Sequence, residues 1–419
     1  MAYQIKNNMN VQTDTKLQSF LSGFEGVREN AIQNEAWDAL QYLDFPTTRD
    51  EYWKYTRISK IANAKLSSGK ASNTILDLEK HLLSDQFVII ENGIFRADLS
   101  SFDLSKVNVK VESTDTLVQT TANMDELFQA MNTALAEQTL FISIPKKQVW
   151  ETPVQVIYIT TENQIMSNTR LVFESEDFAE GHVITTFINE GNSQSLSNHY
   201  TEVLVAENAH LKLDKIQVGN GWHVATENVW QDGNSTFKIN TMTLKGDIVR
   251  NNLNIEVAGE NCETFLNGAV ITKENQLVDN HSFVNHLVSN CMSDENYKYV
   301  LDGKSTGVFN GRVVVQPDAQ KINAYQQNGN VLLSDFAKIN SKPELEIYAD
   351  DVKCSHGSTT GQLDEDALFY LQARGISKDK ARKILVSAFV GEVLQSLDNE
   401  KVLAYVNQVL FDEFGWTEM

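Results

Sequence analysis

A long central stretch of short β-prone runs, separated by polar turn residues, constrains the fold of this chain more than any other feature. Between Thr139 and about Lys353, runs rich in Val, Ile, Thr and aromatic residues alternate with clusters of Asn, Gly and Asp. Three such clusters, at 207–209, 232–234 and 259–261, recur at a spacing of roughly 25 residues. This period predicts a solenoid of β coils with Asn and Gly in left-handed corner turns, and a large β-sandwich is the alternative. The runs expected as strands are 154–158, 170–173, 182–188, 202–205, 211–216, 237–244, 253–257, 308–315 and 331–333.

Helical periodicity appears on both sides of this stretch, so the chain divides into three regions. Residues 1–137 are expected to form a helical domain with some short strands, and 138–360 the β coils. Residues 361–419 are expected to be helical again. Within the first region, the apolar spacing predicts helices over 15–30, 35–45 and 124–137.

The C-terminal region contains one helix that is apolar on several sides. Ser377 is a good N-cap residue, and the helix after it carries Ile384 and Phe389 on one face. Val386 and Val390 extend the apolar surface most of the way round. Such a helix needs cover on several sides, so both intrachain packing and a docked partner remain open.

Composition narrows the function classes. At 419 residues the chain is long enough for two or three domains or one elongated repetitive domain. A net charge of −21 disfavours binding to nucleic acid or an anionic membrane, since both depend on positive protein charge. Residues 1–14 lack the apolar segment of a secretory signal, and no apolar run approaches the roughly 18 residues of a spanning helix. Three widely separated cysteines argue for a reducing compartment, so we expect a cytoplasmic protein.

One short motif places a thiol next to an imidazole. Cys354 and His356 are two residues apart, so in an extended strand they point to the same face. One sulfur and one nitrogen make half of a tetrahedral site for a soft metal, and the missing ligands would come from elsewhere, such as a second chain. Lys353 and the imidazole would favour the thiolate. The alternative is a buried structural cysteine followed by a histidine that caps the end of the solenoid.

Other candidate motifs favour structural roles. Residues 303–306, Gly-Lys-Ser-Thr, resemble the end of a phosphate-binding loop, but Lys298 stands where that loop needs glycine, so we expect a tight turn. His281, His286 and Cys291 are each five residues apart, a spacing that suits no metal motif, although coils could bring them together. The aromatic residues Tyr52, Trp53 and Tyr55 are expected to pack the helices onto the next domain rather than to form a ligand cage. No motif for nucleophilic catalysis appears, so we expect no self-sufficient active site.

Several segments together resemble the SufB/SufD family, the scaffold subunits of the SUF iron–sulfur cluster assembly system. The resemblance implies a mainly β fold, a right-handed parallel β-helix between helical N- and C-terminal domains. The Cys-Ser-His-Gly run is typical of the SufD branch, whereas the SufB branch has a Glu-His pair in this region. SufB itself is the near alternative, since the two branches share their architecture. The segments that carry the resemblance are 46–47 with 51–56, 307–312 with 319–321, 328–334, 345–357, and 368–371 with 374–376.

The resemblance also implies partners and a site. The chain would act with the sister subunit SufB and the ABC-type ATPase SufC, as a non-catalytic scaffold that binds no nucleotide itself. A transient iron–sulfur cluster would form at the interface with SufB, with His356 as the first expected ligand and Cys354 as the second. Relatives often carry a histidine where this chain has Asn290, so a role for the Cys291 neighbourhood stays open, as does a homodimer of the isolated chain. The residues expected to contact the ATPase are Leu368, Phe369, Tyr370, Arg374, Ile384 and Phe389.

Two rival functions remain beside this one. The first is a polysaccharide-active β-helix enzyme, but such enzymes are usually secreted and this chain shows no signal segment. The second is an interaction protein without metal, which would yield no iron or sulfide when reconstituted with its partners.

Overall fold

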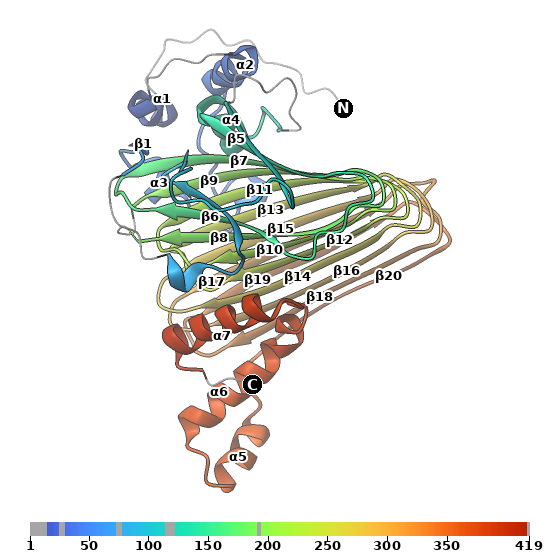
Figure 1. Ribbon diagram of the computed structural model, residues 1–419. Helices are drawn as coiled ribbons and strands as arrows, with labels where there is room; N and C mark the ends of the chain where they lie inside the picture. Colours follow the sequence, from blue (N-terminus) through green and yellow to red (C-terminus); the bar gives the residue numbers. More distant parts are fainter. Residues whose placement is uncertain (1–14, 25–29, 73–77, 114–121, 191–193, 417–419) are drawn as a thin grey trace.

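A computed structural model describes residues 15–24, 30–72, 78–113, 122–190 and 194–416 of the chain. These residues form a parallel β-helix of two sheets, flanked by helices (Figure 1). From residue 138 onward, successive strands alternate between the sheets and pair in parallel with the next strand of the same sheet, which confirms the predicted solenoid and excludes the sandwich.

In the solenoid, each sheet contains every second strand of the chain, placed side by side in sequence order. In sheet A the spatial order is β19 (Lys338–Ile347), β17 (Thr306–Val315), β15 (Leu277–His286), β13 (Ile248–Val257), β11 (Trp222–Gln231), β9 (Leu196–Val205), β7 (Ile165–Ser175), β5 (Gln138–Ile144) and β4 (Asn108–Ser113), with β1 (Ser67–Ser68) beside β7. In sheet B the order is β20 (Val352–Gly361), β18 (Ile322–Leu332), β16 (Met292–Leu301), β14 (Glu263–Thr272), β12 (Thr236–Thr243), β10 (His210–Gln217), β8 (Glu180–Asn189), β6 (Val154–Thr160), β2 (Gln86–Glu91) and β3 (Ile94–Phe95). Strands β2 and β4 come from the N-terminal region, so both sheets extend into it.

The coils are slightly longer than the predicted period. Residues in register on neighbouring coils are between 26 positions apart, as for His210 and Thr236, and 32 apart, as for Thr306 and Lys338. The predicted corner clusters contain left-handed residues, with φ of 60° at Asn208, 56° at Asn234 and 60° at Asn261. Asn tolerates this conformation better than most residues do, which explains its recurrence at the corner.

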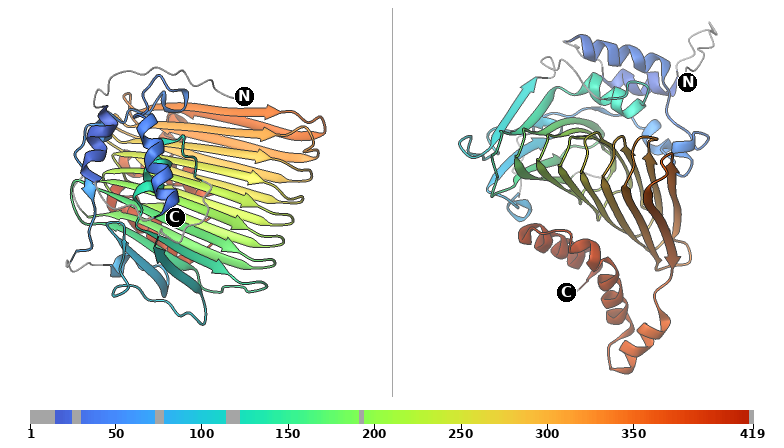
Figure 2. Two further views of the ribbon diagram at one scale, coloured as in Figure 1. Left: turned by 90° about the horizontal axis from the view of Figure 1, so that it is seen from above. Right: turned by 90° about the vertical axis from the view of Figure 1, so that its right-hand side faces the viewer.

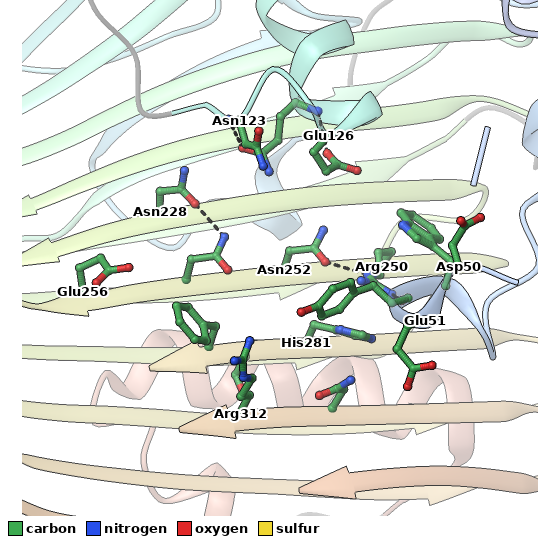
Figure 3. Close-up of a pocket in the computed structure, with 17 residues that line it drawn as sticks. Asp50, Glu51, Asn123, Glu126, Asn228, Arg250, Asn252, Glu256, His281 and Arg312 are labelled. Atoms are coloured by element: carbon green, nitrogen blue, oxygen red, sulfur yellow. Dashed lines mark hydrogen bonds between the residues drawn. The ribbon is translucent and has the colours of Figure 1, made fainter. Parts of the chain in front are cut away.

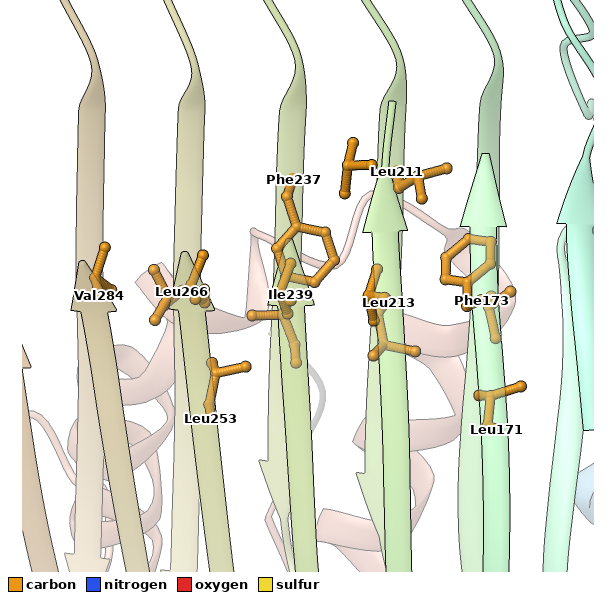
Figure 4. Packing of buried hydrophobic residues seen from close by; sticks show 14 of the residues in the cluster. Leu171, Phe173, Leu211, Leu213, Phe237, Ile239, Leu253, Leu266 and Val284 are labelled. Atoms are coloured by element: carbon orange, nitrogen blue, oxygen red, sulfur yellow. The ribbon is translucent and has the colours of Figure 1, made fainter. Parts of the chain in front are cut away.

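Inward-pointing side chains from both sheets form the main hydrophobic core (Figure 4). Leu171 and Phe173 on β7 alternate with outward residues, and so do Phe237 and Ile239 on β12. Their burial stabilises the coils by about 1.5–3 kcal/mol for each large side chain.

Helices cover the outer face of each sheet. The N-terminal ones are α1 (Lys16–Leu21), η1 (Ser22–Phe24), α2 (Ala31–Ala39), η2 (Leu40–Tyr42), η3 (Glu51–Trp53), α3 (Ser59–Ala62), η4 (Glu79–His81) and α4 (Leu127–Leu135). Of these, α4 lies on sheet A, where Asn132 donates to the carbonyls of Thr169 and Asn198 at 3.1 and 2.8 Å. The helix predicted over 15–30 begins as expected but is short, and residues 25–29 lie outside the described residues. The helix predicted from 35 starts earlier, because Asn30 caps it.

The C-terminal helices are α5 (Glu365–Ala373), α6 (Lys378–Leu394) and α7 (Glu400–Phe414), on the side of sheet B (Figures 1 and 2). Ser377 caps α6 as predicted. Val386, Val390 and Val393 of α6 are buried against residues of sheet B and α7. Intrachain packing therefore covers much of the surface for which a docked partner was the alternative. Among the described helices, none is both long and apolar enough to cross a membrane.

Candidate functional site

The solenoid ends in two strands that each have a neighbour on one side only. β19 is the last strand of sheet A and β20 is the last strand of sheet B. Both are ten residues long, so they leave long rows of backbone groups free to pair with another chain. Apolar side chains lie exposed at the same end, with Tyr348 60% and Phe336 66% accessible. This end has the features of an interaction surface.

Cys354 and His356 both point inward from β20, as their spacing predicted. In register they lie beside Ala324 and Gln326 of β18, which are buried inside the solenoid. The last coil has no further coil to cover it, so Cys354 is only half-buried and His356 is exposed. The structure thus holds a thiol and an imidazole on one face at the open end.

The expectation of a thiolate at Cys354 is wrong for the isolated chain. Burial raises the pKa of the Cys354 thiol, and a hydrogen bond from the Ala324 backbone offsets only part of this effect. Lys353 is one residue away in a strand, so it lies on the opposite face and does not stabilise the charge. The thiol is therefore neutral until another positive group or a metal approaches it.

The other candidate ligands are not gathered into a site. His281 faces outward with its Nε2 3.0 Å from Asp279, whereas His286 faces inward and bonds Ser293 at 2.9 Å. Cys291 lies at a coil corner, where its thiol donates to the Gly259 carbonyl. Within the described residues, no group of three or more His, Cys, Asp or Glu side chains is arranged to hold a metal ion.

One neighbouring pair was missed in the sequence. Cys262 and Cys291 stack on successive corners, and both thiols donate to the Gly259 carbonyl, at 3.1 and 3.2 Å. Their separation of 29 positions equals one coil, as the register of Glu263 with Met292 shows. That number was the available signal, but it had no meaning before the coil length was known.

The remaining motifs take structural roles. Gly303 adopts φ of 66° in the turn between β16 and β17, as expected for a turn. Trp53 is buried and packs on Phe128 of α4 and under the Arg250 guanidinium, which confirms its packing role. Tyr52 is different, because it is exposed and lines a cavity on sheet A.

The residues expected to dock an ATPase divide into two groups. On α5, Phe369 and Tyr370 are 72% and 55% exposed, and the exposed Arg374 lies over the Tyr370 ring at 4.3 Å. Leu368 is buried, and Ile384 and Phe389 of α6 are half-buried. Only the first group is freely accessible in this chain, and its docking role stays a prediction.

Comparison with known proteins agrees with this architecture. The model of the SufBD core domain of the SUF system for FeS cluster assembly matches residues 157–389. The chain belongs to the SufBD family. It is 28% identical to the iron–sulfur cluster assembly protein SufD of Escherichia coli (strain K12), over 92% of this chain and 94% of that protein. It is 30% identical to an iron–sulfur cluster assembly SufBD family protein of Synechocystis, over 91% and 90% of the two chains.

A plant protein is also similar to the chain. The chain is 28% identical to the chloroplastic protein ABCI7 of Arabidopsis thaliana, over 88% of this chain and 83% of that protein. These similarities confirm the resemblance that the motifs carried, and they cover nearly the whole chain.

Proposed function

We propose that this SufBD-family chain is a non-catalytic scaffold subunit on which an iron–sulfur cluster is assembled, in the cytoplasm, together with SufB and SufC. The cluster is cargo, formed at the interface with SufB and then released. The observation that carries the proposal is the pairing of Cys354 with His356 on the inner face of the last coil. Thiolate and imidazole groups are ligands of iron–sulfur clusters. Two such groups are fewer than a complete cluster site needs, so the other ligands would come from a partner.

The open end of the solenoid supports a shared site. A partner strand that pairs with β19 or β20 would continue the sheets and close the last coil over Cys354 and His356. Closure would also bring in the missing ligands, and a positive metal centre would favour the thiolate that the isolated chain does not. A site made by two subunits can open again when they move apart, which lets the cluster leave.

The C-terminal helices support the ATPase contact. The exposed aromatic pair Phe369 and Tyr370 on α5 offers apolar area that this chain leaves uncovered. Helix α6, which follows α5, is fixed to sheet B, where Lys298 donates to the Phe389 carbonyl at 2.9 Å. Motion of SufC during ATP hydrolysis would therefore be transmitted through these helices to the solenoid.

Substitution of His356 tests the proposal. In the complex co-expressed with SufB and SufC and reconstituted anaerobically, His356→Ala is expected to lower iron and sulfide content about tenfold or more, because it removes a ligand. Iron and acid-labile sulfide per complex are the measurement, and size-exclusion chromatography checks that the complex still forms.

The matched control is Ser355→Ala on the same strand. Ser355 points to the opposite face, so its loss is expected to leave cluster content unchanged. Wild-type cluster content in His356→Ala, or equal losses in both variants, would sink the proposed role of His356. Cys354→Ser then separates a ligand, whose loss lowers the content, from a structural cysteine, whose loss does not.

A further inference from the structure

A cavity of about 660 Å³ lies on the outer face of sheet A, on the other side of that sheet from the interior where Cys354 and His356 point (Figure 3). Its floor includes Asn254, Phe283 and Arg312, from the neighbouring strands β13, β15 and β17. Its walls include Tyr52 of η3 and Glu126 before α4. This volume lies within the range of small-molecule sites, so the cavity can hold a ligand.

The cationic groups of the cavity already have partners. The Arg250 guanidinium lies 2.5 Å from the buried carboxylate of Asp279. Arg312 lies 2.8 Å from Glu346 and over the ring of Phe283. A phosphate or carboxylate ligand would have to compete with these carboxylates, so the cavity disfavours anions.

Three carboxylates of the cavity are bound only to neutral donors. Asp50 accepts from Thr47, Glu126 from the Gln129 backbone at 3.0 Å, and Glu256 from Asn285 at 2.7 Å. Among the described residues, no basic side chain lies within ion-pair distance of these three. Burial raises the pKa of Glu126 and of Glu256, and the charge of Arg250 offsets only part of this effect at Glu126, so both carboxylates bear a cost for being charged. A cationic ligand would remove that cost.

The carboxylates are spread along the cavity rather than gathered at one point. Figure 3 shows Glu256 and Asp50 at opposite ends, with Glu126 between them along one wall. Arg250 donates to the Tyr52 carbonyl, and Glu256 lies six positions further along the same strand. In an extended strand this is a distance of about 20 Å. A compact cation would meet only one carboxylate, whereas an elongated one would meet several.

The polar floor is largely satisfied within the protein. The Asn254 amide donates to Asn228 at 2.8 Å, and the Arg250 Nε donates to Asn252 at 2.7 Å. The amide oxygens of Asn228 and Asn252 thus already accept hydrogen bonds from within the protein. The carboxylates are therefore the strongest acceptors left for a ligand. The exposed ring of Tyr52 adds a surface on which an ammonium group binds favourably.

We propose that this cavity binds a linear organic polycation, an aliphatic chain that carries two or more ammonium groups. Its ammonium groups pair with Glu126, Glu256 and Asp50, and its methylene groups lie along Tyr52. This site is independent of the cluster site, so either can fail in experiment without the other.

Isothermal titration of the full-length chain with spermine at low salt tests the site. The wild-type chain is expected to bind one spermine in a saturable step. Glu126→Gln combined with Glu256→Gln keeps the shape and the N-cap acceptor but removes two charges. It is expected to weaken binding about tenfold or more, since each exchange removes a charge-assisted hydrogen bond.

A matched control is needed because a chain with a net charge of −21 attracts any polycation. Glu260→Gln combined with Glu207→Gln removes the same charge from exposed corners of the solenoid and is expected to change the affinity less than twofold. Equal weakening in both double variants, or no saturable step in the wild type, would overturn the proposal. So would a neutral oligosaccharide or inorganic phosphate that binds where spermine does not. Circular dichroism melts confirm that every variant is folded.

Discussion

A buried ion pair lies where the N-terminal segment meets sheet A. Arg250 and Asp279 are almost inaccessible, and Thr56 donates a hydrogen bond to the same Asp279 oxygen that Arg250 contacts. Asp279→Asn would leave the Arg250 charge buried without its partner, so it is expected to lower the free energy of unfolding by about 3–5 kcal/mol. Urea unfolding measures this loss.

The exposed pair of Lys146 and Asp177, 2.7 Å apart, provides the control. Asp177→Asn is expected to cost less than about 1 kcal/mol, because water already screens that pair. Equal losses of stability in Asp279→Asn and Asp177→Asn would contradict the importance of burial.

Burial alone would raise the pKa of Asp279, but the charges of Arg250 and His281, together with hydrogen bonds, lower it to about 2. Its stabilisation is thus present above the ordinary pKa of 3.8 and lost as pH falls through about 2.

At the scale of single residues, prediction succeeded where it depended only on neighbouring positions in the sequence. The two-residue period placed Cys354 and His356 on one face, and the structure confirms it. The same period also places Lys353 on the other face, so the thiolate expectation failed by ignoring that rule. The stacking of Cys262 on Cys291 depends on a local coil length of 29 residues, which is longer than the period that the corner clusters indicated.

At the scale of one element, one coil corner holds a bulky residue in a left-handed backbone conformation. Phe178 adopts φ of 60° at the corner position that Asn208 and Asn234 occupy on later coils, and it is half exposed. A left-handed conformation costs a residue with a Cβ about 1–2 kcal/mol. Phe178→Gly is therefore expected to be about 1 kcal/mol more stable than Phe178→Ala, which loses the same ring but keeps the strain. Thermal or urea unfolding compares the two, and equal stability would show that the corner carries no strain.

The elements themselves were predicted unevenly. Strand β12 was found because Phe237 and Ile239 alternate with polar residues, and β17 because it contains the short apolar runs 308–309 and 313–315. Strands β11, β14 and β19 were not among the predicted runs. Part of the reason is that the interior contains polar pairs, such as Lys215 of β10, whose ammonium lies 2.5 Å from Glu227 of β11. A buried ion pair between the two sheets makes an inward-facing position look like a surface position, so alternation is hidden. The corner clusters do not suffer from this effect, which is why they gave the period.

The molecule as a whole has helices over the outer faces of its sheets and one open end (Figure 2). At that end Gly357 of β20 has no described atom within 4 Å of the place where a Cβ would stand. Gly357→Arg is therefore expected to leave the stability of the isolated chain within about 0.5 kcal/mol, because the new side chain meets only solvent. In the complex the new side chain would lie on the outer face of sheet B, next to the docked partner strand, so pairing with SufB is expected to weaken about tenfold or more.

Native mass spectrometry of the co-expressed subunits measures this pairing, and a thermal melt of the isolated chain measures its stability. Ser68→Arg is the control, since Ser68 is exposed on β1 beside β7, several coils away from β20. It adds the same charge and bulk, so pairing with SufB should be unaffected. If Gly357→Arg pairs with SufB as well as Ser68→Arg does, the partner does not dock at the open end. The shared cluster site would then have to lie elsewhere, because Cys354 and His356 lie on the same strand as Gly357.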